Sequence, residues 1–213
     1  MLTENSYKIR TKQKNLFLRV AQGHFATSHS HINYFIDVTT QKTRLSEASA
    51  VAKELVSYYK LSTIVDTILC LDGTEVIGTC LADELTRADF ANLNAHQTIY
   101  IVTPEHTTGS QLIFRDNIIP MIKGKNVLIL AASVTTGYTA AAAVEAINYY
   151  QGTVAGISAL FATTEECAGH KVYSVFDPAY LKDYASYPSH ECPWCKKGEK
   201  IDALVNSFGY SKL

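Results

Sequence analysis

Residues 127–143 read VLILAASVTTGYTAAAA and contain the pattern that decides the fold. An apolar run ends at Val134, a short turn of threonine and glycine follows, and an alanine-rich segment of high helix propensity begins at Thr139. A buried strand followed by a tight turn and a helix is the unit from which parallel α/β sheets are built. The stretch therefore predicts a strand over 126–134 and a helix over 139–150.

The sequence on either side repeats this alternation of strand and helix. Strands are expected at 63–71, 97–103 and 153–161, and helices at 44–60 and 75–88. Because helix-sized segments separate successive strands, we expect an α/β protein with a mostly parallel central sheet flanked by helices. Residues 104–125 show no period and contain two prolines and two glycines, which indicates a long connection that is functional or mobile.

Composition limits the classes of protein that the chain can belong to. It has 213 residues, of which 47% are hydrophobic and 18% charged, as in ordinary globular domains. A net charge of -1 gives no general attraction to nucleic acid or to an anionic membrane. No apolar run approaches the roughly 18–20 residues that span a bilayer, and residues 1–14 lack the apolar centre of a secretory signal. We expect a cytoplasmic protein without nucleic-acid or membrane partners.

The turn after the strand at 126–134 is a candidate phosphate site. A helix N-terminus directs backbone N–H groups and the positive end of the helix dipole at one point, which suits an anion. Thr135, Thr136 and Thr139 offer hydroxyl donors, and Gly137 lets the backbone approach an oxyanion closely. A plain strand-to-helix turn capped by threonine explains the same residues, so the local pattern leaves both interpretations open.

The stretch resembles the ribose 5-phosphate loop of type I phosphoribosyltransferases, where an apolar strand, two acidic residues and a Thr-Thr-Gly turn follow one another. Two further segments resemble the orotate phosphoribosyltransferase branch: 22–40 (QGHFATSHSHINYFIDVTT) and 187–198 (YPSHECPWCKKG). The resemblance runs from about 16 to 201. It implies a single phosphoribosyltransferase-like domain over 1–213, with a core of about 44–165 and a small hood formed by about 1–43 and 166–213.

The resemblance assigns roles to individual residues of the loop. It implies that the 5′-phosphate is held by Thr135, Thr136, Gly137, Tyr138 and Thr139. The acidic pair that precedes the loop in active relatives, where it binds ribose hydroxyls and helps to place magnesium, is replaced here by Ala131 and Ala132. Methyl groups do neither, so the catalytic residues stay unknown.

Two further positions depart from the family pattern. The pyrophosphate loop corresponds to Asp72, Gly73, Thr74 and Glu75, where two carboxylates would face a highly anionic ligand at an electrostatic cost. The lysine of the family's lid aligns near Glu105 or His106, and Arg115 supplies a cation there only if the loop folds differently. Thr107, Thr108, Gly109 and Ser110 have the composition of a lid.

Three functions follow from this mixture of kept and lost residues. The favoured one is a non-catalytic binder of a phosphorylated, nucleotide-like small molecule. The second is an active phosphoribosyltransferase that transfers ribose 5-phosphate from phosphoribosyl pyrophosphate (PRPP) to orotate or a similar base, with magnesium held in a new arrangement by Asp72, Glu75 and Glu105. The third is a regulatory dimer partner for an active relative. A homodimer is expected because relatives of this family commonly dimerise.

Histidines and cysteines raise the question of a metal. Cys192 and Cys195 have the Cys-x-x-Cys spacing of zinc sites, His190 lies beside them, and Cys167 with His170 would complete four ligands. A single Cys-x-x-Cys around a Pro-Trp turn also fits a reduced tail, so no metal is assigned. The three histidines of the N-terminal segment are expected on the surface, as is the polar face of the helix at 75–88: His24, His29 and His31; Asp83, Glu84 and Arg87.

Overall fold

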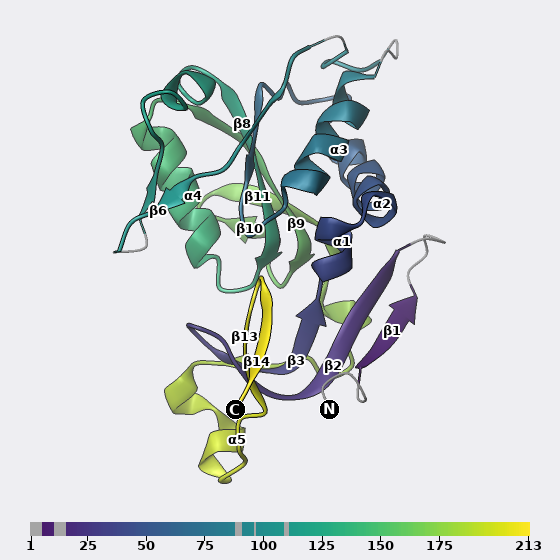
Figure 1. Ribbon diagram of the computed structural model, residues 1–213, viewed down its shortest axis with the longest axis vertical. Helices are drawn as coiled ribbons and strands as arrows, with labels where there is room; N and C mark the ends of the chain where they lie inside the picture. The colour runs from purple at the N-terminus through teal and green to yellow at the C-terminus, as the bar shows by residue number, and fades with distance from the viewer. Residues whose placement is uncertain (1–5, 11–15, 88–90, 96, 109–110) are drawn as a thin grey trace. The chain divides into compact units, whose positions relative to one another are not determined.

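The computed structural model of the chain describes residues 6–10, 16–87, 91–95, 97–108 and 111–213. The chain divides into two compact units, which are Met1–Thr40 together with Phe176–Leu213, and Gln41–Val175. Figure 1 labels their elements. The larger unit, Gln41–Val175, contains all of the strands and helices that the alternating pattern predicts.

The larger unit is built on a six-stranded sheet of order β10-β11-β9-β8-β4-β5. Strands β9, β8, β4 and β5 are mutually parallel, whereas β10 and β11 form an antiparallel hairpin. The strands are β4 (Thr67–Cys70), β5 (Tyr100–Val102), β8 (Asn126–Val134), β9 (Thr153–Ala162), β10 (Glu166–Cys167) and β11 (His170–Phe176). The expected α/β class with a mostly parallel sheet is confirmed.

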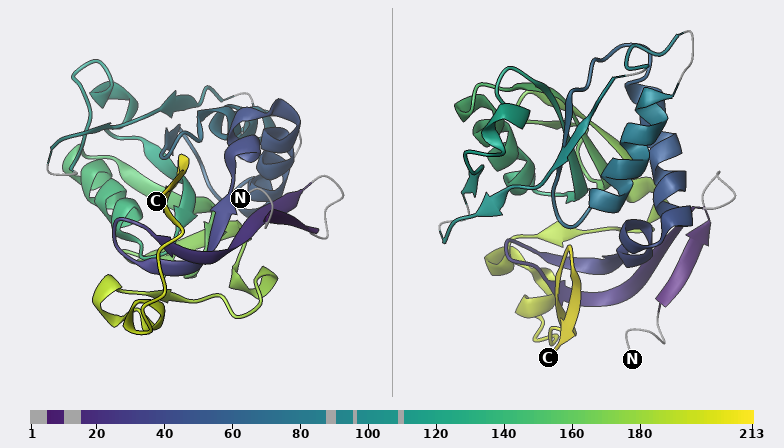
Figure 2. Two further views of the ribbon diagram at one scale, coloured as in Figure 1. Left: turned by 60° about the horizontal axis from the view of Figure 1, so that its bottom comes forward. Right: turned by 45° about the horizontal axis from the view of Figure 1, so that its top comes forward.

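Helices cover both faces of this sheet (Figures 1 and 2). Helix α4 packs on β8 and β9, whereas α2 and α3 pack against each other, and α3 contacts β4 and β5. The helical segments are α1 (Thr39–Thr43), α2 (Leu45–Leu55), η1 (Val56–Tyr58), α3 (Glu75–Thr86), η2 (Ile119–Met121) and α4 (Tyr138–Tyr149). Among the described residues, none of the helices is long and apolar enough to cross a membrane.

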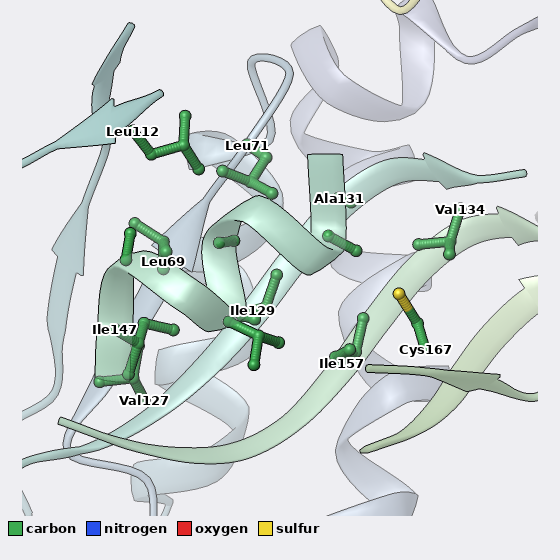
Figure 3. Close-up of a cluster of buried hydrophobic side chains, with 14 of the residues drawn as sticks. Leu69, Leu71, Leu112, Val127, Ile129, Ala131, Val134, Ile147, Ile157 and Cys167 are labelled. Carbon is green, nitrogen blue, oxygen red and sulfur yellow. The ribbon is translucent and has the colours of Figure 1, made fainter. Parts of the chain in front are cut away.

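One apolar core cluster of the larger unit contains residues of β8 and α4 (Figure 3). Val127, Ile129 and Ala131 follow one another on one face of β8, as the two-residue period of a strand requires, and Ile147 of α4 packs in the same cluster. The intervening residues of β8 are also buried. A strand that is buried on both faces reads as a continuous apolar run, which is why the sequence predicted β8 residue for residue.

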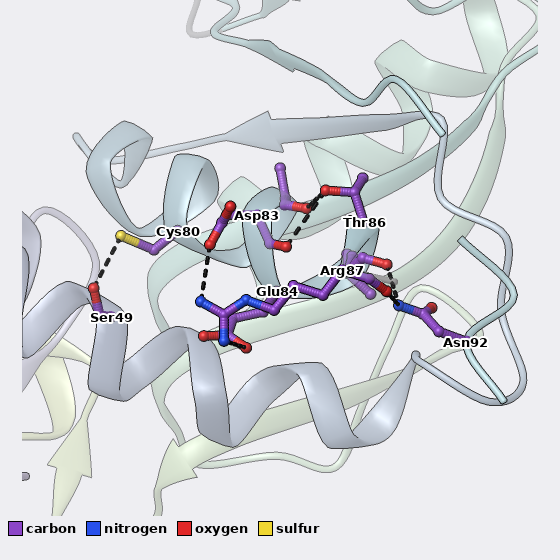
Figure 4. Close-up of polar contacts among 9 residues, drawn as sticks. Ser49, Cys80, Asp83, Glu84, Thr86, Arg87 and Asn92 are labelled. Atoms are coloured by element: carbon purple, nitrogen blue, oxygen red, sulfur yellow. Dashed lines mark hydrogen bonds and ion pairs between the residues drawn. The ribbon is translucent and has the colours of Figure 1, made fainter. Parts of the chain in front are cut away.

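The prediction that one polar face of α3 lies on the surface is only partly correct (Figure 4). Arg87 forms ion pairs with Asp83 and Glu84, both at 3.1 Å. The side chains of Asp83 and Arg87 are 70% and 57% exposed, in agreement with the prediction, but that of Glu84 is only 12% exposed. The Asn92 side-chain amide donates to the carbonyls of Leu85 and Arg87, which provides hydrogen bonds for carbonyl groups at the C-terminal end of α3.

The smaller unit is a second six-stranded sheet of order β12-β3-β2-β13-β14, in which β1 also pairs with β2. Its elements are β1 (Ser6–Arg10), β2 (Phe17–Ala26), β3 (His31–Asp37), η3 (Pro178–Tyr180), β12 (Ser186–Tyr187), η4 (Ser189–Glu191), α5 (Pro193–Lys196), β13 (Ala203–Asn206) and β14 (Gly209–Lys212). Phe25, Phe35, Ala203 and Val205 form its apolar cluster. The sheet therefore joins strands from the two ends of the chain.

Candidate functional site

The candidate phosphate site is the turn between β8 and α4. The strand ends at Val134 and the helix begins at Tyr138, so only Thr135, Thr136 and Gly137 lie between them. Tyr138 and Thr139, the other two residues expected to hold the phosphate, form the first turn of the helix, which begins one residue earlier than predicted. Thr136, Tyr138 and Thr139 are exposed, so the start of the helix is accessible to a ligand.

Gly137 gives this turn its shape. Its backbone has φ +79° and ψ −5°, the left-handed conformation that residues with a Cβ adopt at a cost. A Cβ at this position would also lie 3.0 Å from the Cys167 Sγ. No side chain caps the helix N-terminus, so its first N–H groups and the positive end of the dipole are directed at one point. This geometry suits an oxyanion.

Two residues beyond β9 hold the turn in place. Thr163 donates its backbone N–H to the Val134 carbonyl at 3.0 Å and its hydroxyl to the Thr135 carbonyl at 2.9 Å. The Cys167 thiol donates to the Gly137 carbonyl at 3.4 Å. Burial raises the pKa of this thiol, which keeps it protonated and able to donate at neutral pH. The turn is therefore shaped before any ligand binds.

The predicted pyrophosphate loop lies at the same edge of the sheet. It follows β4, which pairs in parallel with β8 so that Cys70 lies opposite Leu130. Asp72 and Gly73 have φ values of +59° and +77°, and the Thr74 hydroxyl donates to the carbonyls of Leu71 and Leu130. Ligands of parallel sheets collect beyond the carboxyl ends of the strands. The two loops therefore follow neighbouring strands of the sheet.

Two carboxylates, those of Asp72 and Glu75, make this loop unfavourable for an anion. Glu75 is exposed in the first turn of α3, where its own carboxylate interacts with the helix dipole. An Asp72 carboxylate oxygen lies 3.4 Å from the backbone nitrogen of Ala132, which donates to it. Both carboxylates would repel a pyrophosphate placed here.

Lys42 is a site residue that the sequence analysis missed. Its ammonium donates to the Asp72 carbonyl at 2.6 Å, and the side chain is buried. The cation comes from the short helix α1, 30 residues before the loop. No local pattern marks this lysine, because its position depends on how α1 packs against the end of β4.

Magnesium does not fit the residues at the end of β8. Ala131 and Ala132 are both 1% exposed and supply methyl groups where oxygen ligands are needed. Within the described part of the chain, no group of three or more histidines, cysteines and acids with converging ligand atoms lies at this edge of the sheet. Asp72, Glu75 and Glu105, which the active-enzyme hypothesis offers as cation ligands, do not form such a group among the described residues.

The predicted lid contains a short hairpin of β6 (Glu105–His106) and β7 (Leu112–Ile113). Arg115 binds Glu105 through two hydrogen bonds, Nε to Oε1 at 3.0 Å and Nη2 to Oε2 at 2.6 Å. These bonds lower the pKa of the Glu105 carboxyl. Arg115, the cation proposed for the lid, is therefore paired with Glu105, the acid that aligns near the lysine of the family's lid. Gly109 and Ser110 lie outside the described residues.

The predicted surroundings of Cys192 and Cys195 are wrong. The residues that complete a group of four are His24 and His31, not Cys167 and His170. Cys167 and His170 instead lie opposite each other in the β10–β11 hairpin, and His190 is an exposed partner of Glu191. His24 and His31 are also buried, contrary to the surface location expected for them, whereas His29 is exposed.

Comparison with known proteins agrees with this geometry. No protein-family model matches the chain. The chain is 26% identical over 184 residues to an orotate phosphoribosyltransferase of Chlorobaculum parvum, a match that covers 85% of this chain and 86% of that protein. The resemblance to the orotate branch that the motifs indicated is therefore confirmed at the level of sequence.

Solved structures show the same fold. The orotate phosphoribosyltransferase of Mycobacterium tuberculosis superposes with a TM-score of 0.51 at 17% identity, over 77% of this chain and 92% of that one. The adenine phosphoribosyltransferase of Trypanosoma brucei, solved in complex with AMP, pyrophosphate and ribose-5-phosphate, superposes with a TM-score of 0.53 at 14% identity, over 78% of each chain. The chain has the type I phosphoribosyltransferase fold.

Proposed function

We propose that this chain, which has the fold of a type I phosphoribosyltransferase, binds a phosphorylated, nucleotide-like small molecule without transferring its ribose. The proposal rests on two contrasting features at the carboxyl end of strand β8. The Gly137 turn leads into the accessible N-terminus of α4, which suits an anion. Two buried alanines, Ala131 and Ala132, precede it on the same strand.

Phosphate binding is supported by the donors that converge at the turn. Backbone N–H groups at the start of α4 do not titrate and need no counter-ion, so they bind a phosphate over a wide pH range. The Trypanosoma brucei enzyme of the same fold was solved with AMP and ribose-5-phosphate. A nucleoside 5′-monophosphate or a ribose 5-phosphate is therefore the ligand class that we expect.

Loss of transfer is supported by the size of the missing interactions. Hydrogen bonds to charged groups contribute about 1.5–3 kcal/mol each, so losing two carboxylates costs about 3–6 kcal/mol. At 1.4 kcal/mol per decade, this corresponds to roughly two to four decades in affinity for the ribose hydroxyls. Stabilisation of charge in the transition state is lost as well. The Asp72 and Glu75 carboxylates add repulsion toward pyrophosphate.

One observation favours the second candidate, an active transferase. The Asp72 carboxylate accepts a hydrogen bond from the Ala132 N–H at 3.4 Å, so one acid remains beside the position of the missing pair. The buried Lys42 ammonium at the Asp72 carbonyl adds a cation to the same loop. These two groups would have to replace an acidic pair, a pyrophosphate loop and a lid lysine together. For this reason the binder is preferred.

Titration of ribose 5-phosphate and of ribose into the protein tests the proposal. We expect ribose 5-phosphate to bind about 100-fold or more tightly than ribose, because the phosphate gains at least two charge-assisted hydrogen bonds of about 1.5–3 kcal/mol. Incubation with PRPP and orotate should release no pyrophosphate above the rate without protein. Equal affinities would refute the phosphate site, and steady pyrophosphate release would establish the active transferase instead. Dimerisation stays a prediction from the family resemblance.

A further inference from the structure

Four metal-ligating side chains converge inside the smaller unit. They are two imidazoles from the β2–β3 hairpin, His24 and His31, and two thiols at the start of α5, Cys192 and Cys195. One nitrogen or sulfur atom of each lies within 4.8 Å of those of the other three. His24, His31 and Cys192 are buried, and Cys195 is exposed. Both thiols are free of disulfides.

The separations between these atoms are those of a tetrahedral zinc site. Zn–N bonds of about 2.0–2.1 Å and Zn–S bonds of about 2.3 Å place tetrahedral ligand atoms about 3.3 Å apart for two nitrogens and about 3.6 Å apart for a nitrogen and a sulfur. His24 Nε2 and His31 Nδ1 are 3.1 Å apart. His24 Nε2 lies 3.5 Å from Cys192 Sγ and 3.6 Å from Cys195 Sγ, and His31 Nδ1 lies 3.3 Å from Cys195 Sγ.

The hairpin places the two imidazoles on one side. A shift of register between Gln22 and Phe25 puts His24 in an irregular part of β2, and such bulges re-aim side chains. His31 opens β3 opposite Ala26. The turn between the strands is fixed by the Thr27 N–H, which donates to the Ser30 carbonyl, and by the Ser30 N–H, which donates to the Thr27 hydroxyl. The ligand spacing on this side is thus set by hydrogen bonds within the hairpin turn.

The thiols come from a tight Cys-Pro-Trp-Cys turn. The Lys196 N–H donates to the Cys192 carbonyl at 3.1 Å, and the Gly198 N–H donates to the Cys195 carbonyl at 2.9 Å. Gly198 has φ +75°, a conformation that favours glycine and ends the turn. Two cysteines three residues apart on such a turn present both sulfurs to one point.

Groups outside the four ligands orient His24. Its Nδ1 lies 3.1 Å from the Lys200 carbonyl, and a hydrogen bond from Nδ1–H to a carbonyl leaves the Nε2 lone pair available for a metal. The His24 N–H donates to the Asp202 carboxylate, and the Asp202 N–H donates to the His24 carbonyl, both at 2.8 Å. The Trp194 ring packs 5.5 Å from the His24 ring. Metal-bound histidines have this kind of support.

We propose that His24, His31, Cys192 and Cys195 bind one zinc ion as a structural site. Four protein ligands of the N₂S₂ type fill a tetrahedral shell and leave no open position for a substrate. The ion joins the hairpin to a segment 168 residues later in the chain, so its binding free energy stabilises the folded state of this unit. The site does not depend on the function proposed for the larger unit.

Metal analysis of the purified full chain tests the proposal. We expect about one zinc per chain, retained through dialysis, because closed Cys₂His₂ sites hold zinc tightly. Replacement of zinc by Co²⁺ should give the visible absorption of a tetrahedral site together with thiolate-to-metal charge-transfer bands. Folded wild-type protein that holds no zinc after incubation with it, that binds iron instead, or that carries a Cys192–Cys195 disulfide would overturn the proposal.

Two pairs of variants separate ligation from packing. Cys195→Ser removes the exposed ligand and should weaken zinc binding by more than about 100-fold, since even loss of a supporting group around a metal costs 10–100-fold. Cys80→Ser removes a thiol on α3 and should keep full zinc content. His24→Ala and His29→Ala form the matched pair on the hairpin, and only the former should lose the ion. Equal zinc content in Cys195→Ser and Cys80→Ser would contradict the assignment, and if His24→Ala does not fold, the wild-type and Co²⁺ measurements decide.

Discussion

Replacing Gly137 with valine is expected to weaken binding of ribose 5-phosphate by about 100-fold or more. The residue has φ +79°, a conformation that is a genuine outlier for a β-branched side chain. Its Cβ would meet the Cys167 Sγ at 3.0 Å, so the contact that holds the turn must shift together with the strained backbone. The N–H groups of the α4 N-terminus then no longer converge on the phosphate, and losing two charge-assisted hydrogen bonds costs about 3–6 kcal/mol. Calorimetric titration measures the change.

Gly124→Val provides the control for backbone strain. Gly124 has a similar φ of +68° and lies in the turn before β8, and a Cβ added to it would meet no neighbouring heavy atom within 4 Å. Both variants strain a left-handed backbone, and Gly137→Val adds the contact with Cys167, so it should lose at least as much stability as Gly124→Val, but only Gly137→Val alters the phosphate turn. If the two variants bind ribose 5-phosphate equally well while folded, the phosphate is held somewhere else.

Restoring an acid at position 131 is expected to destabilise the larger unit by about 3–5 kcal/mol. Ala131 is 1% exposed and belongs to the apolar cluster beneath α4 (Figure 3). An aspartate there would bury a carboxylate without a charged partner, which is among the costliest single changes. Denaturant unfolding of Ala131→Asp measures this loss. The family's acid therefore cannot be put back by one substitution.

Ser133→Asp is the matched control on the same strand. Ser133 is exposed two residues further along β8, so the same carboxylate remains hydrated and should change stability by no more than about 0.5 kcal/mol. A stable Ala131→Asp protein that gains magnesium binding would show that position 131 faces a ligand site rather than the core. In that case, one substitution would reverse part of the change that removed catalysis.

The sequence predicted the central part of the fold closely and its edges poorly. Strand β8 was expected at 126–134 and spans those residues, because an apolar run bounded by polar residues and a Thr-Gly turn leaves one interpretation. Helix α4 was expected at 139–150 and spans Tyr138–Tyr149. Strand β5, expected at 97–103, is only Tyr100–Val102, since the edge of a sheet imposes fewer constraints on residue type.

The candidate sites differ in how well they could be predicted from the local sequence. The Gly137 turn consists of the three residues between β8 and α4, so its position could be predicted from the strand and helix on either side. Lys42 reaches the Asp72 loop only through tertiary packing. His24 and Cys192 are 168 residues apart, and nothing in the spacing of either motif identifies the other as its partner. The sequence analysis named Cys167 and His170 as possible further ligands, and the structure groups His24 and His31 with the two cysteines instead.

Calorimetric titration of PRPP into the protein, with and without magnesium, tests the central claim most directly. The claim is that the 5′-phosphate turn at Gly137 persists while the magnesium and pyrophosphate side is lost. We predict that PRPP binds through its 5′-phosphate with an affinity that changes by less than about threefold, or about 0.7 kcal/mol, when magnesium is added. Strengthening by about 100-fold or more in the presence of magnesium would contradict the account, because residues of this chain would then hold the metal and the pyrophosphate.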